Sequence, residues 1–254
     1  RGASFHQGTF GLEKIDKKDF KPKRKEEKNQ WTDDIKTRET KVDSGILPQD
    51  YYNVFKFEDL IVGSGKTNFL AVVHIDGNGM GARINRLYEK LESQNLGWDD
   101  FKVKIREYSE MIDSDFKAAY KEMLYEVTKS DIMKDSKKLP IRRIITSGDD
   151  ICFAADGKIG IEAAKIYIEK LTGKSNKIDG EKYSACAGVS ITHIKYPFFR
   201  SYELAEALCS NAKKYGAMES PGDNGAGVSL IDWHISFGEL KDTLEIERRE
   251  HRTD

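Results

Sequence analysis

The stretch FLAVVHIDGNGMG (residues 69–81) begins as a continuous apolar run, ends that run in an acid at Asp76 and passes into a glycine-rich turn. A short apolar run that leads into a turn signal predicts a buried β-strand. Glycines let backbone N–H groups approach a ligand closely, and the N-terminus of a helix favours phosphate. We therefore expect a buried strand over 68–76, a turn that faces a ligand, and a helix over 80–93.

A second acid-bearing turn lies further along, in IRRIITSGDDICFAA (residues 141–155). Two short apolar runs, 141–146 and 151–155, flank the tetrapeptide SGDD, and this arrangement predicts a β-hairpin with the acids at its tip. Two adjacent acids repel each other, and either exposure to water or a bound divalent cation would offset their charge.

The remaining elements extend these two turns into an α+β unit. Apolar spacing indicates helices over 100–129, 159–171 and 202–215, the last with Ser201 as its N-cap, and strands over 183–192 and 228–233. The order strand, helices, hairpin, helix, strand is the ferredoxin-like βαββαβ arrangement. A right-handed crossover makes the first two strands run in the same direction, so both acid-bearing turns are expected at one edge of the sheet.

Three carboxylates, a glycine-rich turn and two lysines are thus expected together. The helix over 202–215 ends at the same edge and carries Lys213 and Lys214 to it. Carboxylates with few other ligands suit Mg²⁺ or Mn²⁺ that also binds substrate phosphates. A lysine near a helix C-terminus often only complements the helix dipole, but beside metal-bound phosphates it neutralises a triphosphate. The constellation is typical of two-metal phosphoryl or nucleotidyl transfer.

Composition excludes several classes of protein. The 254 residues carry 42 basic and 43 acidic side chains, so no global basic field indicates nucleic-acid binding. No apolar run approaches the ~18 residues that a membrane span needs, and no signal peptide is visible. The three cysteines are odd in number, far apart and set among apolar or small neighbours, which predicts buried thiols. We expect a cytoplasmic protein with no membrane partner.

The chain divides into three predicted parts. Residues 1–66 are a charged N-terminal extension or linker, because the run KKDFKPKRKEEK (17–28) is highly charged and no clear periodicity follows it before Tyr51. Residues 67–236 are the α+β domain. Residues 237–254 are a charged helical tail.

The motif pair DGNxMG (76–81) and SGDD (147–150), in this order on a βαββαβ core, resembles the palm domain of the large polymerase-like subunit of type III CRISPR effector complexes. Diguanylate cyclases with GGDEF domains are more distant relatives. The segment 204–216, where an Ala-Lys pair precedes a glycine, is similar to the late helix of both families. The resemblance covers about residues 68–233.

The resemblance implies a palm nucleotidyltransferase that joins nucleoside triphosphates, typically ATP, into cyclic oligonucleotide messengers for antiviral defence. Carried over by position, the metal ions would be held by Asp76, Asp149, Asp150 and the carbonyl of Ile75. The nucleotide would lie against Gly77, Asn78, Gly79, Met80, Ser147 and Gly148, and its triphosphate would meet Lys213, with Lys214 beside it. No side-chain general base is required for this chemistry.

The chain departs from the family pattern in three places. Ser147 stands where the family usually has glycine, and Asn78 stands where an acid is frequent. Ile151 occupies the position of the GGDEF phenylalanine, which argues against a diguanylate cyclase.

A templated polymerase is a further alternative, although no strongly basic groove is evident. A catalytically inactive palm that acts as a nucleotide sensor or scaffold is the non-enzymatic alternative.

A single palm needs a source for its second nucleotide. Neither a second palm nor a nuclease motif is present in these 254 residues. A homodimer with two active edges facing each other is the simplest expectation. There are two other possibilities. The chain is part of a larger effector complex, through which it would contact RNA, or it is an excerpt of a longer chain.

His74 shares one side of its strand with Asp76. A histidine packed in the core is favoured there over a histidine that supports the metal ligands.

Overall fold

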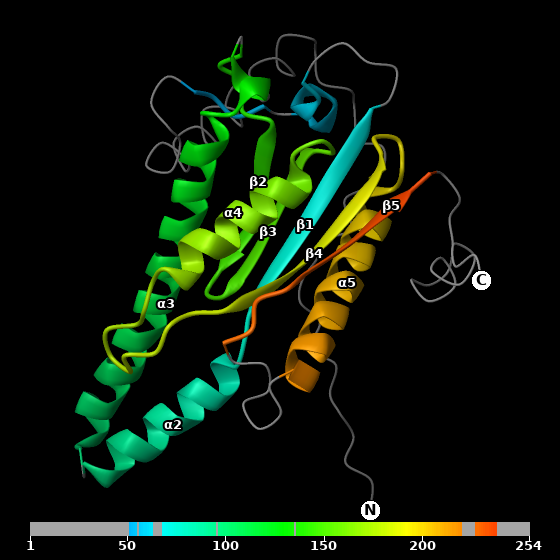
Figure 1. Cartoon of the computed structure of the whole chain (residues 1–254). Coiled ribbons are helices and arrows are strands. Elements are labelled where there is room, and N and C mark those ends of the chain that lie inside the picture. Colours follow the sequence, from blue (N-terminus) through cyan, green and yellow to red (C-terminus); the bar gives the residue numbers. More distant parts are fainter. Residues whose placement is uncertain are drawn as a thin grey trace, which may run out of the picture. The chain divides into compact units, whose positions relative to one another are not determined.

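A mixed five-stranded β-sheet organises the part of the chain that the computed structural model describes (Figure 1). The described residues are 51–54, 56–62, 68–94, 96–134, 136–219 and 227–237. All of them belong to the unit Ser44–Asp254. The predicted extension over 1–66 lies outside them at 1–50, 55 and 63–66, and the predicted tail lies outside them at 238–254.

The sheet has the strand order β2-β3-β1-β4-β5. Its strands are β1 (Phe69–Gly77), β2 (Ile141–Ser147), β3 (Asp150–Asp156), β4 (Ala185–His193) and β5 (Ile231–Ser236). β1 pairs antiparallel with β3 and with β4, and β2 pairs antiparallel with β3. β5 adds a parallel edge strand beside β4. The first four strands therefore have the ferredoxin-like order, and the predicted α+β fold is confirmed.

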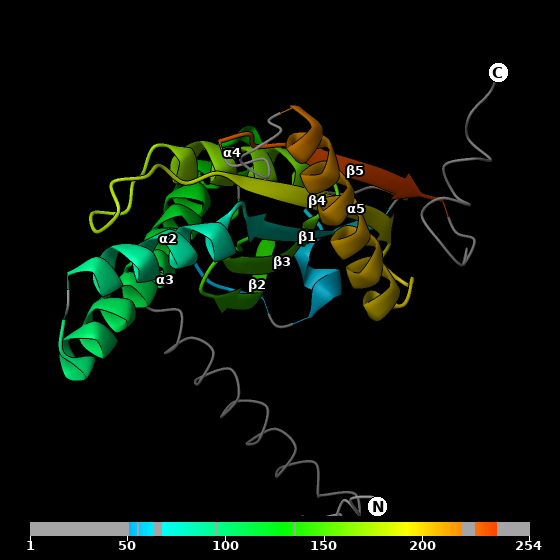
Figure 2. The same cartoon turned by 90° about the horizontal axis from the view of Figure 1, so that it is seen from below.

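The described part of the chain has four helices, of which three cover the faces of this sheet and one, α2, extends beyond its end (Figures 1 and 2). They are α2 (Met80–Ser93), α3 (Trp98–Val127), α4 (Gly160–Thr172) and α5 (Phe198–Glu219), with short 3-10 turns η2 (Phe57–Leu60) and η3 (Asp131–Met133). α3 and α4 cover one face, and α5 packs on the other, over β4 and β1. Both faces of β1 are therefore buried, which is why its sequence is continuously apolar rather than alternating.

The helix that carries Lys213 and Lys214 begins earlier and ends later than its sequence indicated, since α5 continues to Glu219. α5 starts at Phe198, so the expected N-cap, Ser201, lies inside the first turn and is buried. The hydroxyl groups of Ser201 and Thr192 are 2.6 Å apart, and this contact joins α5 to β4. A tertiary hydrogen bond has replaced the local capping bond that the residue type suggested.

Part of the segment before β1 belongs to the core. Val54 and Leu60 are buried in one cluster with Leu70 and Val72 of β1 and Cys152 of β3. All three cysteines are free and buried, and burial raises the pKa of the Cys152 thiol to about 12. Cores of this kind are formed by contiguous apolar contacts, so residues 56–62 contribute to the stability of the sheet that follows them.

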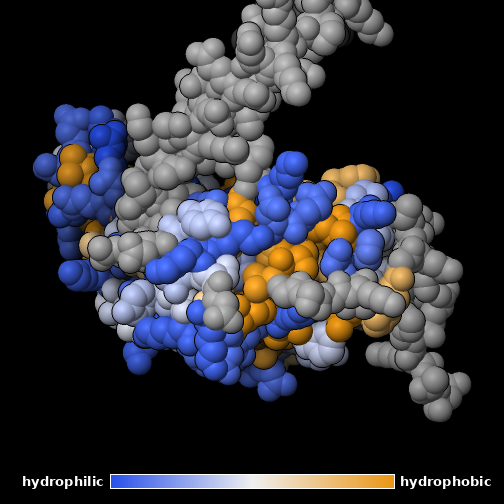
Figure 3. Space-filling model, turned by 90° about the horizontal axis from the view of Figure 1, so that it is seen from above, coloured by the Kyte–Doolittle hydropathy of each residue, from blue (hydrophilic) through white to orange (hydrophobic). Residues whose placement is uncertain are grey.

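The surface is strongly hydrophilic, in keeping with a charged fraction of 33%. Figure 3 shows the face seen from above, where hydrophobic residues gather mainly near the middle, among hydrophilic ones. Among the described helices, none combines the length and the hydrophobicity that crossing a bilayer requires.

A close backbone contact holds α5 against β4. A Cβ atom added to Gly188 would overlap the carbonyl oxygen of Ala205 and the amide nitrogen of Cys209, both in α5. Only glycine permits this approach of helix to strand. The contact fixes the height of α5 above the sheet and, with it, the position of the residues in the following helical turn.

We predict that Gly188→Ala lowers the free energy of unfolding by roughly 1–3 kcal/mol or more, because the added methyl group overpacks the interface between helix and strand. Urea denaturation followed by circular dichroism measures this change. Gly81→Ala is the matched control, since a Cβ there meets nothing within 4 Å; it should change stability by less than about 1 kcal/mol. Equal losses for the two variants would contradict the close contact.

Candidate functional site

Two of the predicted acids lie directly opposite each other on neighbouring strands. In the pairing of β1 with β3, Asp76 is the partner of Asp150, at the end of the sheet where the glycine-rich turn begins. Directly opposed side chains in an antiparallel pair lie close together, and like charges there repel. The predicted meeting of the two acid-bearing turns at one sheet edge is thus present in the structure.

A lysine from α5 reaches this pair from the covering face. The Nζ atom of Lys213 lies 2.5 Å from Oδ2 of Asp76 and donates a hydrogen bond to the carbonyl oxygen of Gly77 at 2.9 Å. The Lys213 and Asp76 side chains are each about one-third exposed, so this ion pair is open to solvent and to a ligand. Lys214 is exposed and has no ion pair or hydrogen bond with any described residue. Of the two predicted lysines, only Lys213 therefore contacts the acid-bearing edge in the structure.

The third acid, Asp149, lies in the tight turn between β2 and β3. Its backbone carbonyl accepts a hydrogen bond from the Gly77 amide at 3.3 Å, which ties the two acid-bearing turns together. A Cβ atom on Gly77 would lie 2.9 Å from Cβ of Asp149, so glycine is needed there. Gly148 has φ of 60°, a left-handed conformation that favours glycine, and Ser147 pairs with Asp150 at the end of the hairpin.

The site carries more negative charge than its lysine offsets. Burial raises the pKa of the Asp149 carboxyl group, the charges of Asp76 and Asp150 raise it further, and Lys213 lowers it. Burial also raises the pKa of Asp150, and the charge of Asp76 adds to that effect, while His74 and Lys213 oppose it. A divalent cation is a natural partner for such a group of carboxylates.

In the glycine-rich turn, some residues bury their side chains and others are exposed to solvent. The side chains of Asn78 and Met80 are both buried, so they do not line an open ligand surface. Gly79 has φ of 67° and precedes α2, whose N-terminus has no side-chain cap. Gly81 is exposed, and a Cβ there would meet nothing within 4 Å. The turn thus leaves backbone N–H groups of the first helical turn open to an anion.

Asn78 acts as a clamp within the protein rather than as a surface ligand. Its backbone amide donates to the carbonyl of Ser184 at 2.9 Å. Its Nδ2 atom donates to the carbonyl of Val228 at 2.7 Å. These bonds join the turn to the segments that lead into β4 and β5. The predicted contact of Asn78 with nucleotide stays a prediction, and for its side chain the geometry favours a supporting role.

Two supporting residues were not found by sequence reasoning. Arg83, in the first turns of α2, is 3% exposed and donates to both carboxylate oxygens of Asp179 at 2.8 Å. Asp113 of α3 accepts a hydrogen bond from the Gly148 amide at 3.3 Å and pairs with Lys117 at 2.6 Å. Both lie in charged helices, where nothing in the sequence distinguishes them from solvent-exposed neighbours.

His74 is a packed histidine that also faces the acids. It is buried, its ring meets Tyr202 edge-on with centroids 5.8 Å apart, and its Nε2 atom lies 4.0 Å from Oδ1 of Asp150. Ile75 is fully buried in the central strand, paired with Ile151 on one side and Ala187 on the other. The predicted use of its carbonyl as a metal ligand stays a prediction.

The donor set fits a hard divalent cation, although its side chains are not gathered around one point. Among the described residues, no group of three or more His, Cys, Asp or Glu side chains is arranged to hold a metal ion. In this arrangement the Asp76 carboxylate is paired with Lys213 of α5. Carboxylate oxygens are the ligands that Mg²⁺ and Mn²⁺ prefer. Burial is the main cause of the raised pKa values of Asp149 and Asp150, and the charge of Asp76 adds to it.

Comparison with known proteins gives structural matches only. No protein-family model and no curated protein matches the sequence. Among solved structures, the chain is similar to the active GGEEF domain of a diguanylate cyclase from Vibrio cholerae, with 14% identity, a TM-score of 0.36 and coverage of 65% of this chain and 83% of that one. It is also similar to a chain of the Csm1–Csm4 cassette solved in complex with cA4, with 17% identity and a TM-score of 0.42, and in complex with pppApA, with 19% identity and a TM-score of 0.41. These matches cover 63% of this chain but only 21% of the cassette chain.

We predict that Asp149→Asn raises the free energy of unfolding at pH 7 in the absence of metal ions. A carboxyl group whose pKa is raised on folding weakens the folded state above that pKa, and the penalty disappears as the pH falls to the ordinary value near 4. The gain should therefore be largest at neutral pH and vanish near pH 4. Thermal unfolding from pH 4 to 8 measures it.

The control for this experiment is Asp131→Asn, which removes an exposed carboxylate paired with Lys134 outside the site. It should leave the unfolding temperature almost unchanged at every pH, since exposed ion pairs contribute little. Millimolar Mg²⁺ should stabilise the wild type more than Asp149→Asn. A neutral-pH loss of stability in Asp149→Asn would show that the carboxylates do not repel one another as described.

Proposed function

We propose that this chain is a nucleotidyltransferase, dependent on Mg²⁺ or Mn²⁺, that joins nucleoside triphosphates into cyclic oligonucleotide second messengers, with ATP as the first substrate to test. The observation that carries the proposal is the pairing of Asp76 with Asp150 across two strands, with Lys213 beside both the acid and the Gly77 carbonyl. The match of DGNxMG and SGDD to palm-domain motifs supports the same chemistry and a place in CRISPR-like antiviral defence in the cytoplasm.

The carboxylates would bind the metal ions, and the lysine would bind the phosphates. Asp76, Asp149 and Asp150 would hold the cations, which when bound supply a lowered pKa for the attacking ribose hydroxyl and charge stabilisation for the leaving pyrophosphate. Lys213 would exchange its partner, Asp76, for the triphosphate as the metal neutralises that acid. Its position beside the Gly77 carbonyl keeps the ammonium group next to the turn.

The backbone of the turn would orient the triphosphate. The uncapped N-terminus of α2 presents N–H groups beside the open glycines, where the helix dipole favours negative charge. In the reaction, a ribose hydroxyl oxygen forms a bond to the α-phosphorus, and the bond from that phosphorus to the bridging oxygen of the β-phosphate breaks. The hydroxyl proton passes to water, and pyrophosphate leaves.

A second nucleotide must be brought to the first. We propose that a second copy of the chain supplies it, with the two acid-bearing edges facing each other, or that a larger effector complex does so and contributes contact with RNA. Residues 67–236 would be the palm domain in either assembly. The roles of the extension before it and of the tail after it stay open to experiment.

One observation favours a second candidate, a palm that binds nucleotide without turning it over. In the structure, the Asp76 carboxylate is already paired with Lys213 at 2.5 Å. If this pair persists when nucleotide binds, the Asp76 carboxylate is not available to a metal ion. The chain would then be a sensor or scaffold. A diguanylate-cyclase-like enzyme is a separate alternative, and its product would distinguish it.

We predict that the purified chain releases pyrophosphate from nucleoside triphosphates when Mg²⁺ or Mn²⁺ is present, because the paired acids bind the catalytic cations. A pyrophosphate assay on each of the four triphosphates, with mass spectrometry of the products, measures this and identifies the base and ring size. The double variant Asp149→Ala, Asp150→Ala should lose at least about 100-fold in rate, the scale of removing direct transition-state stabilisation.

Three outcomes separate the candidates. Cyclic oligoadenylate supports the proposal, whereas cyclic di-GMP indicates the diguanylate-cyclase alternative. Metal-dependent nucleotide binding without any pyrophosphate release indicates a sensor. Full activity of the double variant, with folding confirmed by circular dichroism, would sink the proposed mechanism.

We also predict different effects for the two neighbouring lysines. Lys213→Ala should weaken ATP binding by about tenfold or more, because it removes the one ammonium group that the structure places beside Asp76 and Gly77. Lys214→Ala removes the same charge from an exposed position and should weaken binding less than about threefold. Isothermal titration calorimetry with a non-hydrolysable ATP analogue and Mg²⁺ compares them. Equal effects would mean that only the local net charge matters.

A further inference from the structure

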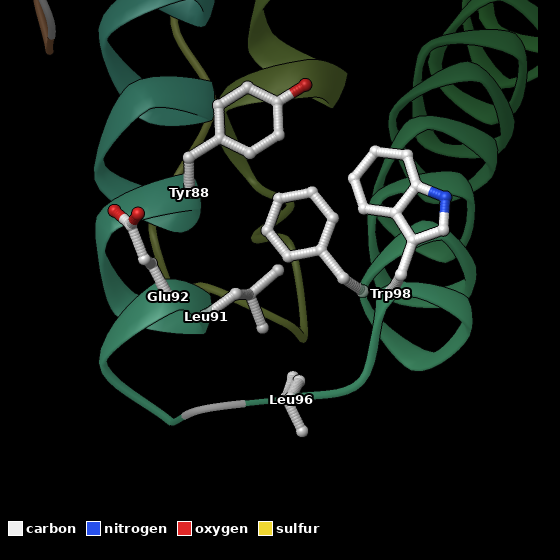
Figure 4. Close-up of a pocket in the computed structure, with 6 residues that line it drawn as sticks. Tyr88, Leu91, Glu92, Leu96 and Trp98 are labelled. Carbon is white, nitrogen blue, oxygen red and sulfur yellow. The ribbon is translucent and has the colours of Figure 1, made fainter.

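The corner between α2 and α3 lies at the end of α2 that is farther from the acid-bearing edge (Figure 1). Three aromatic rings stack there. Tyr88 of α2 stacks on Phe101 of α3 with centroids 5.5 Å apart and an interplanar angle of 12°. Trp98 also stacks on Phe101, with centroids 5.9 Å apart and an interplanar angle of 11°. We call Tyr88, Phe101 and Trp98 the aromatic corner. Figure 4 shows the rings of Tyr88 and Trp98 above Leu96, which lies in the connection between α2 and α3.

The aromatic corner is exposed and hollow. Trp98 is 71% exposed and Tyr88 is 39% exposed, values that are high for large aromatic side chains. A hollow of about 540 Å³ lies between the rings and the side chains of Leu91, Glu92 and Leu96. Rigid aromatic side chains around a hollow are the usual anchors of protein interfaces, because little side-chain entropy is lost when they are covered.

Glu92 lines the hollow, and the segment that forms the corner is mainly negative. Residues 88–102 contain four carboxylates, Glu89, Glu92, Asp99 and Asp100, against the two ammonium groups of Lys90 and Lys102, which leaves a formal charge of −2. All six side chains are on exposed residues. One cation already uses the aromatic surface, since the Nζ atom of Lys102 lies 5.7 Å from the centroid of the Trp98 ring. The corner is therefore suited to apolar groups flanked by positive charge.

We propose that the aromatic corner is a docking site for a basic, amphipathic segment of a partner protein. One large apolar side chain of that segment would fill the hollow beside Phe101, and lysine or arginine residues on either side of it would meet Glu92 and Asp100. This site is separate from the acid-bearing edge, and its occupation does not require the nucleotidyltransferase activity proposed above.

A single-stranded nucleic acid is the other ligand that stacked aromatic rings bind, and the charges disfavour it. Nucleic-acid platforms combine aromatic rings with a positive groove that follows the phosphates, whereas this corner has an excess of carboxylates. The N-terminus of α3, which would otherwise attract a phosphate, carries Asp99 and Asp100 in its first turn. The chemistry of the corner thus favours a basic peptide over RNA.

The test uses the full-length protein and three fluorescein-labelled probes. The first is a short synthetic peptide with leucine and phenylalanine on one helical face and lysine on the other, and the second has glutamate in place of lysine. The third is a short single-stranded RNA. Fluorescence anisotropy at low and high salt measures binding to the wild type, Trp98→Ala, Glu92→Lys and Tyr125→Ala. Tyr125 is the matched control, since it is 56% exposed on the same helix with the Nζ atom of Lys129 4.4 Å from its ring centroid.

The basic peptide should bind the wild type, and the acidic peptide and the RNA should not. Trp98→Ala should weaken binding of the basic peptide by about tenfold or more, the scale of a hot-spot residue, and Glu92→Lys should also weaken it. Tyr125→Ala should change it by less than about twofold. Circular dichroism confirms that each variant is folded, which is expected because these side chains are exposed.

Three results would overturn the proposal. The first is binding of the basic peptide that Trp98→Ala leaves unchanged, or no binding of that peptide at all. The second is RNA binding that depends on Trp98, which would make the corner a nucleic-acid platform. The third is self-association of the wild type in sedimentation velocity that Trp98→Ala abolishes, which would make a second copy the occupant.

Discussion

The antiparallel pairing that sets Asp76 opposite Asp150 is the constraint on which the site depends. Asp76 lies one residue before the end of β1 and Asp150 begins β3, and nearly all the other residues of these strands are buried, so neither acid can move far without disturbing the centre of the sheet. The repulsion between them must be offset locally, and Lys213 does this from α5. The helix that carries this lysine packs closely on β4 at Gly188, where a side chain would not fit. Core packing and site electrostatics are therefore parts of the same arrangement.

The sequence predicted the fold because the signals for it are local and repetitive. A continuous apolar run identifies β1 as a strand buried on both faces, and the helix expected over 80–93 is observed as α2 over Met80–Ser93. The meeting of the two acid-bearing turns also followed from the sequence, since strand direction and crossover handedness leave one edge for both. Ser201 was misjudged as a helix cap because its hydroxyl group bonds to Thr192, a partner that is distant in the sequence and visible only after folding.

The site was less predictable than the fold, because it depends on which way each side chain turns. Within the motif DGNxMG, Asn78 and Met80 face the interior, while Gly79 and Gly81 leave the backbone open. Two adjacent lysines on a helix differ by about 100° in direction, so Lys213 reaches Asp76 and its neighbour Lys214 faces solvent. Motif spacing identifies the segment that carries the chemistry, but it does not separate residues that bind a ligand from residues that hold the segment in place.

The glycine-rich turn is held from both of its ends, and this bears on how it would act. On one side, Asn78 is bonded to Ser184 and Val228; on the other, Arg83 is buried against Asp179. Burying an ion pair is costly, and it is tolerated here because both carboxylate oxygens of Asp179 accept hydrogen bonds. The result is a turn whose open N–H groups are fixed before any ligand arrives. Fixed dipoles need no reorganisation when charge develops beside them, so a rigid turn of this kind stabilises a transferring phosphate better than a flexible one.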